Sequence, residues 1–581
     1  MNTNNRSTKV ELPVNNSYKH DLSHRHTTTL DFFRLQPVFC QDMVPGDKMS
    51  VDIRSIIQSA PMATQVFGGA HLDLHAFFVP NRIVWDGWDE YITHNSQTDV
   101  DLTPPFYTLR DLKNIATGSF DVKECRRVYS SLGYPVYSNA TSDTFPFSAL
   151  QARAYQRIWF DYYRDSVNIP DGTFVLETTS GHADPNYIMP HYRCFKKDFL
   201  TTLLSSPQYG VGSSSPVTSS LGDVLGDPHD TVYPLFTTAK GTTLIDGSQT
   251  STGYFTKYNQ KVTVSALRGA VALQRFLERL NVSGTRPMER LLSIMGVKPS
   301  VERLNMAEFI GAHTIKVNID GLVNTGSNEE VSSDSSTFGM HNAWGVQNNN
   351  GSVGNNHLGQ GYQSGYASGS GNTNKFSYSA TEHGHFIIIA SLIPEYCNPN
   401  AVSRQFYRGV STPEPSAFDY FTPDLDGVGY QEMLLSEVVL PTAIDTDVND
   451  TWLNDYDPYK VVGYQPKYED YRFVQDRLSG DFLDSDSALA LRNMVFTRDL
   501  PSKFNPDDVY VRALLTTANF GDRESFDMHF QITDSSLDHF VLHMYIVNDA
   551  IRPISNNQLP TELSDMANSH MLDVSNGGVR L

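Results

Sequence analysis

The sequence is poor in the features that mark secreted, zinc-binding and membrane-spanning proteins. It contains only four cysteines in 581 residues, far apart and without a CxxC or Cys/His spacing. Cysteines placed in this way predict buried thiols of a reducing compartment and argue against a disulfide framework or a zinc site. No N-terminal apolar stretch resembles a signal peptide, and no run of about 18 apolar residues is long enough to span a membrane. We therefore expect a chain that is made and folded in a cytosol, with no membrane insertion.

Charge and apolar content are low as well. Charged residues make up 19% and hydrophobic residues 39% of the chain, below the roughly 25% and roughly 45–50% of average soluble domains. Uncharged polar residues, glycine and proline take their place, and 11% of residues are aromatic, a mixture that favours strands and long loops over helices. The net charge of −21 means that any DNA contact must be local or carried by a basic partner, because phosphate binding needs Lys and Arg.

Motifs of common enzymes are also missing. The sequence has no GxSxG elbow, no GxxxxGK[ST] loop and no GxGxxG after a strand, and nothing favours a paired-carboxylate glycosidase site, although the sequence does not exclude one. The strongest metal candidate is Glu382-His383-Gly384-His385, whose HxH spacing puts both imidazoles on one strand face, as in cupin-type barrels. Only Glu395 follows it as a further ligand, so we favour a hydrogen-bonded start of a strand.

Two acidic turns have the oxygen density that calcium prefers. They are DLDGVG at 424–429 and DTDVND at 445–450, and neither completes an EF-hand loop. A structural calcium at a subunit contact and ordinary turns are both open, with turns favoured, and we expect no other cofactor. The candidate ligands are Asp424, Asp426, Asp445 and Asp447.

Strand patterns occur early, in the middle and late in the chain. Residues 72–79 alternate apolar and polar side chains, and apolar runs follow at 385–393 and 539–547. Very long connections separate them, which favours one β-sandwich with elaborated loops over a string of compact domains.

Helical spacing of apolar residues predicts helices over 149–164 and 265–280. We expect each apolar stripe to pack into the core rather than to form a partner-binding groove. The stripes are Leu150, Ala154, Ile158 and Tyr162 in the first helix and Leu267, Val271, Leu277 and Leu280 in the second.

Two segments lack any packing pattern. Residues 205–260 are rich in Ser, Thr, Gly and Pro, and residues 325–378 are rich in Gly, Asn and Ser, with no charged residue from Ser335 to Asn374. Such stretches bury too little apolar surface to offset the entropy lost on ordering. We expect surface excursions, linkers or segments ordered by a neighbouring subunit.

The first 30 residues are the least acidic part of the chain and predict an extended arm, separate from a single domain over 31–581. The arm touches DNA or a neighbouring subunit in one interpretation and is a disordered terminus in the other. Its candidate DNA or interior contacts are Arg6, Lys9, Lys19 and Arg25.

Several stretches, in a fixed order along the chain, resemble the major capsid proteins of the microvirus family, gokushovirus branch. The resemblance lies in DLSHRHTTTLDFFRLQPVFCQDMVPGDKMSVDI (21–53), HLDLHAFFVPNRIVWDGWDEYI (71–92), RAYQRIWFDYYRD (153–165), KKDFLTTLLSSPQYG (196–210), LQRFLERLNVSGTRPMERLLSIMGV (273–297), and the short motifs Thr381-Glu-His-Gly384 and Arg552-Pro-Ile-Ser555. The chain departs from the family in its long loop at 325–378 and in KKDFLTTLLSSPQ, which replaces the more common form of that segment.

The resemblance implies an all-β fold, an eight-stranded viral jelly roll (an antiparallel β-sandwich) with long loop insertions containing a few helices. It implies a structural subunit and no enzyme: sixty copies form a T=1 icosahedral capsid of a virion around circular single-stranded DNA, assembled in the bacterial host cytoplasm. The alternatives are a carbohydrate-binding β-sandwich and a cupin-type metalloenzyme.

The resemblance also implies partners. They are further copies of the chain, the viral single-stranded DNA, a small basic DNA-binding phage protein, a DNA pilot protein, an internal scaffolding protein and a host surface receptor. In the family an insertion after the Pro-Gln segment projects from the three-fold axes toward the host, which by position is 211–260 here, within 205–260. The aromatic candidates for this protrusion are Tyr233, Phe236, Tyr254 and Phe255.

Overall fold

The computed structural model describes most of the sandwich and several outlying elements. The described residues are 17–62, 66–93, 102–113, 122–137, 145–164, 176–184, 189–196, 203–204, 242–246, 249–253, 264–282, 286, 289, 292–293, 296, 305–323, 363–397, 425–429, 461–474, 476, 478–482, 494–497, 524–527, 529–530 and 537–553.

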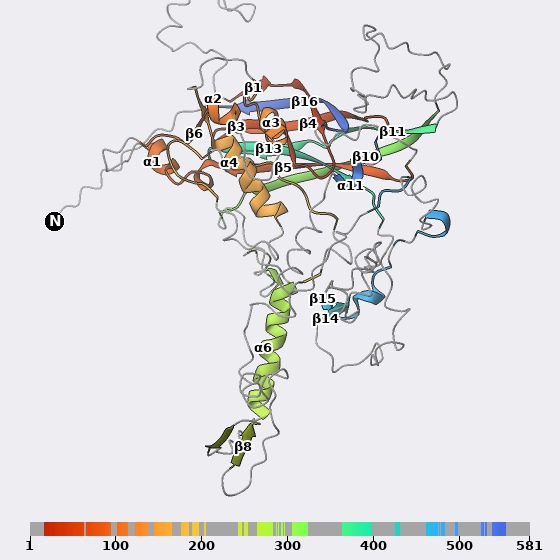
Figure 1. Cartoon of the computed structure of the whole chain (residues 1–581). Coiled ribbons are helices and arrows are strands. Elements are labelled where there is room, and N and C mark those ends of the chain that lie inside the picture. The colour runs from red at the N-terminus through yellow and green to blue at the C-terminus, as the bar shows by residue number, and fades with distance from the viewer. Residues whose placement is uncertain are drawn as a thin grey trace, which may run out of the picture.

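One large antiparallel sheet dominates the chain (Figure 1). Eight strands follow one another in the order β1-β16-β4-β11-β10-β5-β13-β3, while β2 pairs with β16 and β12 with β4. Strands from the two ends of the chain thus lie side by side. The strands are β1 (Tyr18–Asp21), β2 (His24–Leu30), β3 (Gln36–Met43), β4 (Lys48–Ser59), β5 (Gly69–Pro80), β10 (Glu308–Val323), β11 (Gln363–Asn372), β12 (Phe376–Ser379), β13 (Gly384–Pro394) and β16 (Phe540–Arg552).

Smaller elements lie in the long connections. Three two-stranded sheets are β6 (Phe106–Thr108) with β7 (Pro146–Ser148), β8 (Thr242–Asp246) with β9 (Gln249–Gly253), and β14 (Leu425–Gly429) with β15 (Val461–Pro466). The helices are α1 (Trp88–Thr93), α2 (Leu109–Lys113), α3 (Val122–Ser131), α4 (Leu150–Ile158), α6 (Val264–Val282) and α11 (Glu524–Asp527), the π-helix η2 (Trp159–Tyr163), and the 3₁₀ helices η1 (Asn81–Ile83), η9 (Glu469–Tyr471) and η10 (Gly480–Phe482).

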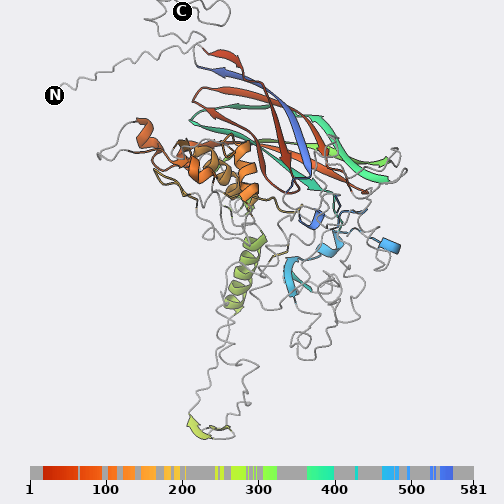
Figure 2. The same ribbon diagram turned by 45° about the horizontal axis from the view of Figure 1, so that its top comes forward.

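The sheet curls until its two ends approach each other (Figure 2). The consecutive strands β2 and β3 pair with β16 and β13 at opposite ends of the strand order, yet His26 Nδ1 lies 2.7 Å from the carbonyl oxygen of Val38. Buried apolar side chains fill the interior, among them Ile53 of β4, Leu542 of β16 and Ile388 of β13. Curling buries one apolar face of every long strand, which confirms the predicted jelly-roll β-sandwich with few helices.

A second core lies outside the sandwich, where helices cover β5 and β13. Ile387 and Ile389 of β13 and Phe77 of β5 pack there with Tyr155 and Ile158 of α4. Because alternate side chains of β13 point into two different cores, all eleven of its residues are buried.

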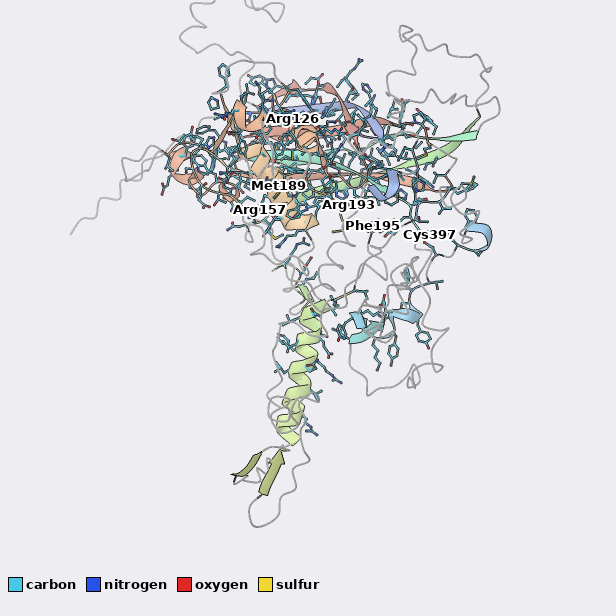
Figure 3. The ribbon with its side chains drawn as sticks, in the orientation of Figure 1. Arg126, Arg157, Met189, Arg193, Phe195 and Cys397 are labelled. Carbon is cyan, nitrogen blue, oxygen red and sulfur yellow. The ribbon has the colours of Figure 1, made fainter. Side chains whose placement is uncertain are left out.

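The segment 189–196 closes one side of this assembly, below the sheet in Figure 3. Arg193 forms an ion pair with Asp73 of β5 at 2.5 Å, and the ring of Phe195 lies 4.5 Å from that of Phe33. These contacts attach an irregular segment to the sandwich through one charged and one aromatic anchor.

The helix predicted over 149–164 is confirmed as α4 followed by η2, and its stripe is buried at Leu150, Ala154 and Ile158. The helix predicted over 265–280 is confirmed as α6. Its expected packing is wrong at Val271, which is 47% exposed.

Other apolar side chains of α6 are exposed as well, whereas polar ones are covered. Leu273 and Phe276 are 44% and 46% exposed, while Glu278 and Asn281 are buried. Figure 1 shows α6 extending away from the sheet, with the β8–β9 hairpin beyond its far end, which explains why Val271 does not reach the core. In the described part of the chain, no helix combines the length and apolarity needed to cross a membrane.

The expectation that 325–378 forms one loop without packing is wrong at its C-terminal end. Residues 363–372 form β11 between β10 and β4, and 376–379 form β12. Glycine allows close contact here: a Cβ on Gly371 would lie 2.9 Å from Ile315 Cγ1, and one on Gly369 3.1 Å from Ile57 Cγ2. Residues 324–362 lie outside the described residues.

The predicted arm is shorter than 30 residues. Residues 18–21 and 24–30 are β1 and β2, paired with β16, so they belong to the sheet. Residues 1–16 lie outside the described residues. Their interpretation as an arm stays a prediction.

Candidate functional site

The helices cover the sandwich over β5 and β13. The face formed by β2, β16, β4 and β11 has no such cover among the described residues and exposes alternate side chains. In β4 and β16 every second residue is buried and those between face outward. Ile56 is 51% exposed and Tyr545 41%, and Arg54 and His543 are exposed beside them. This face is therefore open to contacts in a way that the face covered by α4 is not.

Strand register brings two arginines to either side of one tyrosine. Tyr545 of β16 pairs with Arg25 of β2 on one side and with Arg54 of β4 on the other. Residues in register on neighbouring antiparallel strands have Cβ atoms about 4.5–5.5 Å apart on the same face. The three side chains thus form a row, Arg25–Tyr545–Arg54, called the Arg-Tyr-Arg row below.

A second row lies next to it, two residues along each strand. His543 pairs with Thr27 of β2 and with Ile56 of β4, and its Nδ1 lies 2.7 Å from the hydroxyl oxygen of Thr27. The two rows border an open hollow of about 850 Å³. Its lining residues are Arg25, Arg54, Ser55, Ile56, Ser370, Gly371, Asn372, His543 and Tyr545.

The two arginines of this row differ from Lys19 and Arg552, two cations of the sheet that pair with carboxylates. Among the described residues, neither Arg25 nor Arg54 forms an ion pair, whereas Lys19 in β1 contacts Asp549 at 3.0 Å. Uncompensated guanidinium groups attract phosphate, and an exposed tyrosine ring offers a surface on which a base can stack. The arrangement suits a single-stranded nucleic acid bound without sequence preference.

Two of the four predicted DNA-contact residues lie on this sheet, at different positions. Arg25 lies in the Arg-Tyr-Arg row, and Lys19 lies exposed on β1 in its ion pair with Asp549. Arg6 and Lys9 lie outside the described residues.

Sequence reasoning missed Arg54, His543 and Tyr545, although a signal was present. They occupy outward positions of strands with period-two patterning, and only their pairing with Arg25 brings them together.

The structure describes no side chain of the remaining predicted site residues. Asp426 lies in β14, and its side chain is not described. Asp424, Asp445 and Asp447 lie outside the described residues, as do the four aromatic candidates for the protrusion, Tyr233, Phe236, Tyr254 and Phe255. The calcium and host-attachment assignments of these residues stay predictions.

The Glu-His-Gly-His segment starts β13, and its side chains have separate partners. Glu382 pairs with Arg82 at 2.7 Å, and the ring of His383 lies 5.5 Å from that of Trp88. The buried His385 lies 2.9 Å from a carboxylate oxygen of Asp42. The two imidazoles serve structural contacts at the start of the strand.

A buried ionic cluster joins β16 to the helical cover. Arg34 makes a two-pronged contact with Asp538, at 2.8 and 2.6 Å, and Arg127 of α3 adds a third contact at 2.8 Å. Burial by itself would raise the pKa of the Asp538 carboxyl, but these two guanidinium groups outweigh it and hold that pKa well below its usual range.

Comparison with known proteins gives one consistent result. The capsid protein (F protein) family matches residues 11–560. The capsid protein VP1 of Chlamydia phage 1 is 23% identical over 567 residues, covering 82% of this chain and 86% of that protein.

Two further capsid proteins VP1 match to a similar extent. That of Bdellovibrio phage phiMH2K is 24% identical over 502 residues, covering 78% of this chain and 80% of that protein. That of Spiroplasma virus 4 is 22% identical over 502 residues, with 79% and 81% covered. The family match spans nearly the whole chain, the sandwich and the elements around it included, and the chain therefore belongs to the capsid protein (F protein) family.

Proposed function

We propose that sixty copies of this chain close a T=1 icosahedral shell around a circular single-stranded DNA genome. As a member of a capsid protein family, the chain is a self-assembling structural subunit of a virion and not an enzyme. The family match over 11–560 carries the proposal, and the copy number and genome type rest on the microvirus-like motifs of the sequence. Closed symmetry ends the contacts between copies in a shell instead of a filament.

Negative-stain microscopy of the purified full chain tests the assembly. We expect uniform shells under assembly conditions, with image classes that show icosahedral symmetry. A protein that stays monomeric at high concentration, with and without a co-expressed scaffolding protein, contradicts the proposal.

The open face of the sandwich is the part of the subunit proposed to contact the genome. Its support is the Arg-Tyr-Arg row, which lacks carboxylate partners among the described residues in a chain of net charge −21. Arg25 and Arg54 would hold phosphates while Tyr545 stacks on a base. A small basic phage protein would supply most of the remaining neutralising charge.

Salt titration of single-stranded DNA binding tests this assignment. The double variant Arg25→Gln/Arg54→Gln should reduce the slope of log affinity against log salt by about 1 to 2, because each lost phosphate contact removes roughly 0.7–1. Arg472→Gln is the control, since Arg472 is an exposed arginine that follows η9 and does not line the hollow. An unchanged slope in the double variant contradicts the assignment.

Host attachment is proposed for the insertion at 211–260. The described part of this insertion, the β8–β9 hairpin, lies beyond the end of α6 that is remote from the sheet (Figure 1). Residues Leu273, Phe276 and Leu280 recur at the 3–4 spacing of a coiled-coil seam, and the first two are largely exposed. Three copies of α6 around a three-fold axis would bury this seam and present the hairpins together.

Deleting 211–260 tests the attachment role. Shells should still form, and adsorption to host cells should be lost. Phage that carry the deletion and still infect would show that the receptor contact lies elsewhere.

The other proposed partners follow from the same family resemblance. They are a DNA pilot protein inside the shell and an internal scaffolding protein during assembly in the bacterial cytoplasm. For the carbohydrate-binding and cupin alternatives no contact among the described residues offers support, since His383 and His385 have separate partners.

A further inference from the structure

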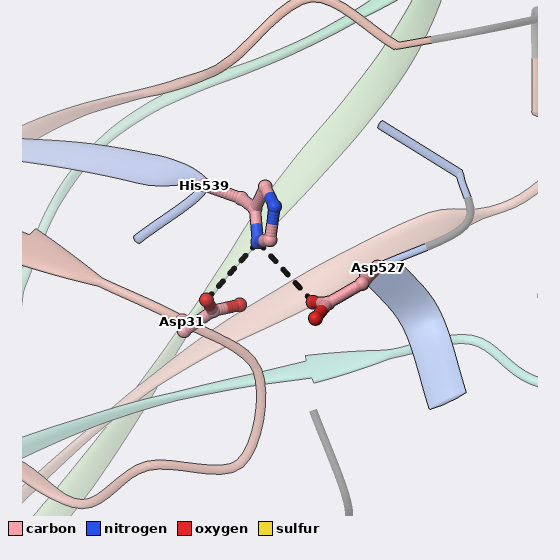
Figure 4. A group of neighbouring side chains, drawn as sticks. All are labelled: Asp31, Asp527 and His539. Atoms are coloured by element: carbon pink, nitrogen blue, oxygen red, sulfur yellow. Dashed lines mark hydrogen bonds and ion pairs between the residues drawn. The ribbon is translucent and has the colours of Figure 1, made fainter. Parts of the chain in front are cut away.

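Three side chains from separate parts of the chain meet in the core of the sandwich. Asp31 follows β2, Asp527 ends α11 and His539 precedes β16. Figure 4 shows both carboxylates approaching the same ring nitrogen of the histidine: Nδ1 lies 3.1 Å from Asp31 Oδ2 and 3.6 Å from Asp527 Oδ1. The ligand atoms all lie within 4.8 Å of one another. The two nitrogen–oxygen distances fit donors around one ion, because bonds of about 2.0–2.2 Å place neighbouring ligands roughly 3–3.5 Å apart.

A proton on the histidine explains this convergence less well than a cation does. Nδ1 carries at most one hydrogen, so it donates a well-directed hydrogen bond to one of the two carboxylates. The other carboxylate oxygen then faces a nitrogen whose hydrogen points elsewhere. A cation between the three donors would contact both oxygens and the nitrogen lone pair at the same time.

The charges of the buried carboxylates also favour a bound cation. The side chains of Asp31 and His539 are 1% exposed and that of Asp527 is 12% exposed, so solvent screens the two carboxylates weakly. The guanidinium of Arg34 donates its hydrogen bonds to Asp538, and its charge also interacts with Asp31. A divalent cation would supply twice the charge of a protonated imidazole to these two weakly screened carboxylates, and buried charges are stabilised by close pairing of this kind.

Neighbouring groups already orient the ligands. The backbone N–H of Phe32 donates to Asp31 Oδ1 at 2.8 Å, which fixes the carboxylate so that Oδ2 faces the histidine. The ring of Phe530 stacks on that of His539 at 4.1 Å. Contacts of this kind hold metal ligands in place in known sites.

We propose that Asp31, Asp527 and His539 bind one divalent transition-metal cation. Two carboxylate oxygens and an imidazole nitrogen suit zinc or manganese better than calcium, which takes oxygen ligands. The ion would tie α11 to β16 and to the connection between β2 and β3. It would thus act as an internal cross-link of the subunit, independent of DNA binding and of host attachment. The site is separate from the acidic turns at 424–429 and 445–450.

Metal titration of the full chain tests the proposed metal site. The protein is stripped with EDTA and titrated with zinc, manganese and, as a spectroscopic probe, cobalt, while the thermal unfolding midpoint is followed. We expect a rise of the midpoint on metal addition and a visible absorption band of bound cobalt. Asp527→Asn should weaken metal binding at least about 10-fold and remove the effect of EDTA. Glu469→Gln, which removes a half-buried carboxylate of η9 outside the cluster, should behave as the unaltered chain.

Two results would overturn the proposal. One is an unfolding midpoint that neither EDTA nor added metal changes, which would show that the cluster is stable without a metal ion. The other is cobalt and zinc binding that Asp527→Asn leaves intact, which would place the metal at other side chains. His539→Gln serves as a second variant if Asp527→Asn folds poorly.

Discussion

Strands β13 and β16 belong to the same sandwich, yet their outward faces differ. Every residue of β13 is buried, because α4 and the segments around it cover its outer side. In β16 only alternate residues are buried, and His543 and Tyr545 face outward. The chain thus supplies its own cover for one face and leaves the other open. We expect substitutions on the covered face to act on folding and those on the open face to act on binding.

The largest expected effect concerns the buried ionic cluster of Arg34, Arg127 and Asp538. Asp538→Asn removes the buried carboxylate that pairs with both Arg34 and Arg127. We expect a loss of about 3–5 kcal/mol in the free energy of unfolding, measured by urea denaturation of the unassembled chain. Asp549→Asn, which breaks the exposed pair with Lys19, should cost less than about 1 kcal/mol. Equal losses in the two variants would contradict the importance of the buried cluster.

The next effect compares the same residue type on the two faces. Ile387→Ala should destabilise the chain by about 2–5 kcal/mol, because it leaves a cavity between β13 and the helices. Ile56→Ala on the open face should change stability by about 0.5 kcal/mol or less, since Ile56 is 51% exposed. The comparison fails if both variants unfold at the same urea concentration.

Acid should weaken the covered face through a buried histidine. Burial lowers the pKa of His191 to about 3, so the unfolded chain takes up protons below about pH 6.5 while the folded chain does not. Stability is therefore complete above pH 6.5 and falls as the pH drops toward 3, by up to roughly 2 kcal/mol at pH 5 from this residue. His191→Phe should flatten the fall in denaturation curves at pH 7 and pH 5. An equally steep fall in that variant would assign the acid sensitivity to other groups.

The smallest expected effect on folding accompanies a clear effect on binding. Tyr545→Ala should weaken single-stranded DNA binding by about 5- to 100-fold, because base stacking contributes about 1–3 kcal/mol, with little change in the unfolding midpoint. Tyr471→Ala, at another exposed tyrosine, is the control. Fluorescence anisotropy with a labelled oligonucleotide measures both.

The sequence predicts the parts of the fold whose pattern is local. Strands at 385–393 and 539–547 and the helix at 149–164 appear because their apolar spacing is decided within a few residues. Strand β11 was missed because its glycines are selected by contacts with Ile57 and Ile315 on neighbouring strands, which lie far away in the sequence.

The candidate sites were harder to predict, because they are formed by residues that lie far apart in the sequence. Arg25 was predicted as a cation of an arm, but its neighbours Tyr545 and Arg54 follow only from the register of three strands. Asp31 and His539 are 508 positions apart in the sequence, so no local motif announces their cluster. Val271 of α6 was mistaken for a core residue because spacing reveals an apolar stripe and not what covers it.

The position of β16 between β4 and the N-terminal strands sets the timing of folding. On the ribosome, β4 is complete long before residues 540–552 are made, and at about 5–20 residues per second the interval is roughly half a minute or longer. During that time the edge of β4 that β16 will occupy is unpaired, and exposed strand edges attract other chains. Newly made subunits therefore need protection during synthesis, and a subunit with the finished open face exists only after nearly the whole chain has been translated.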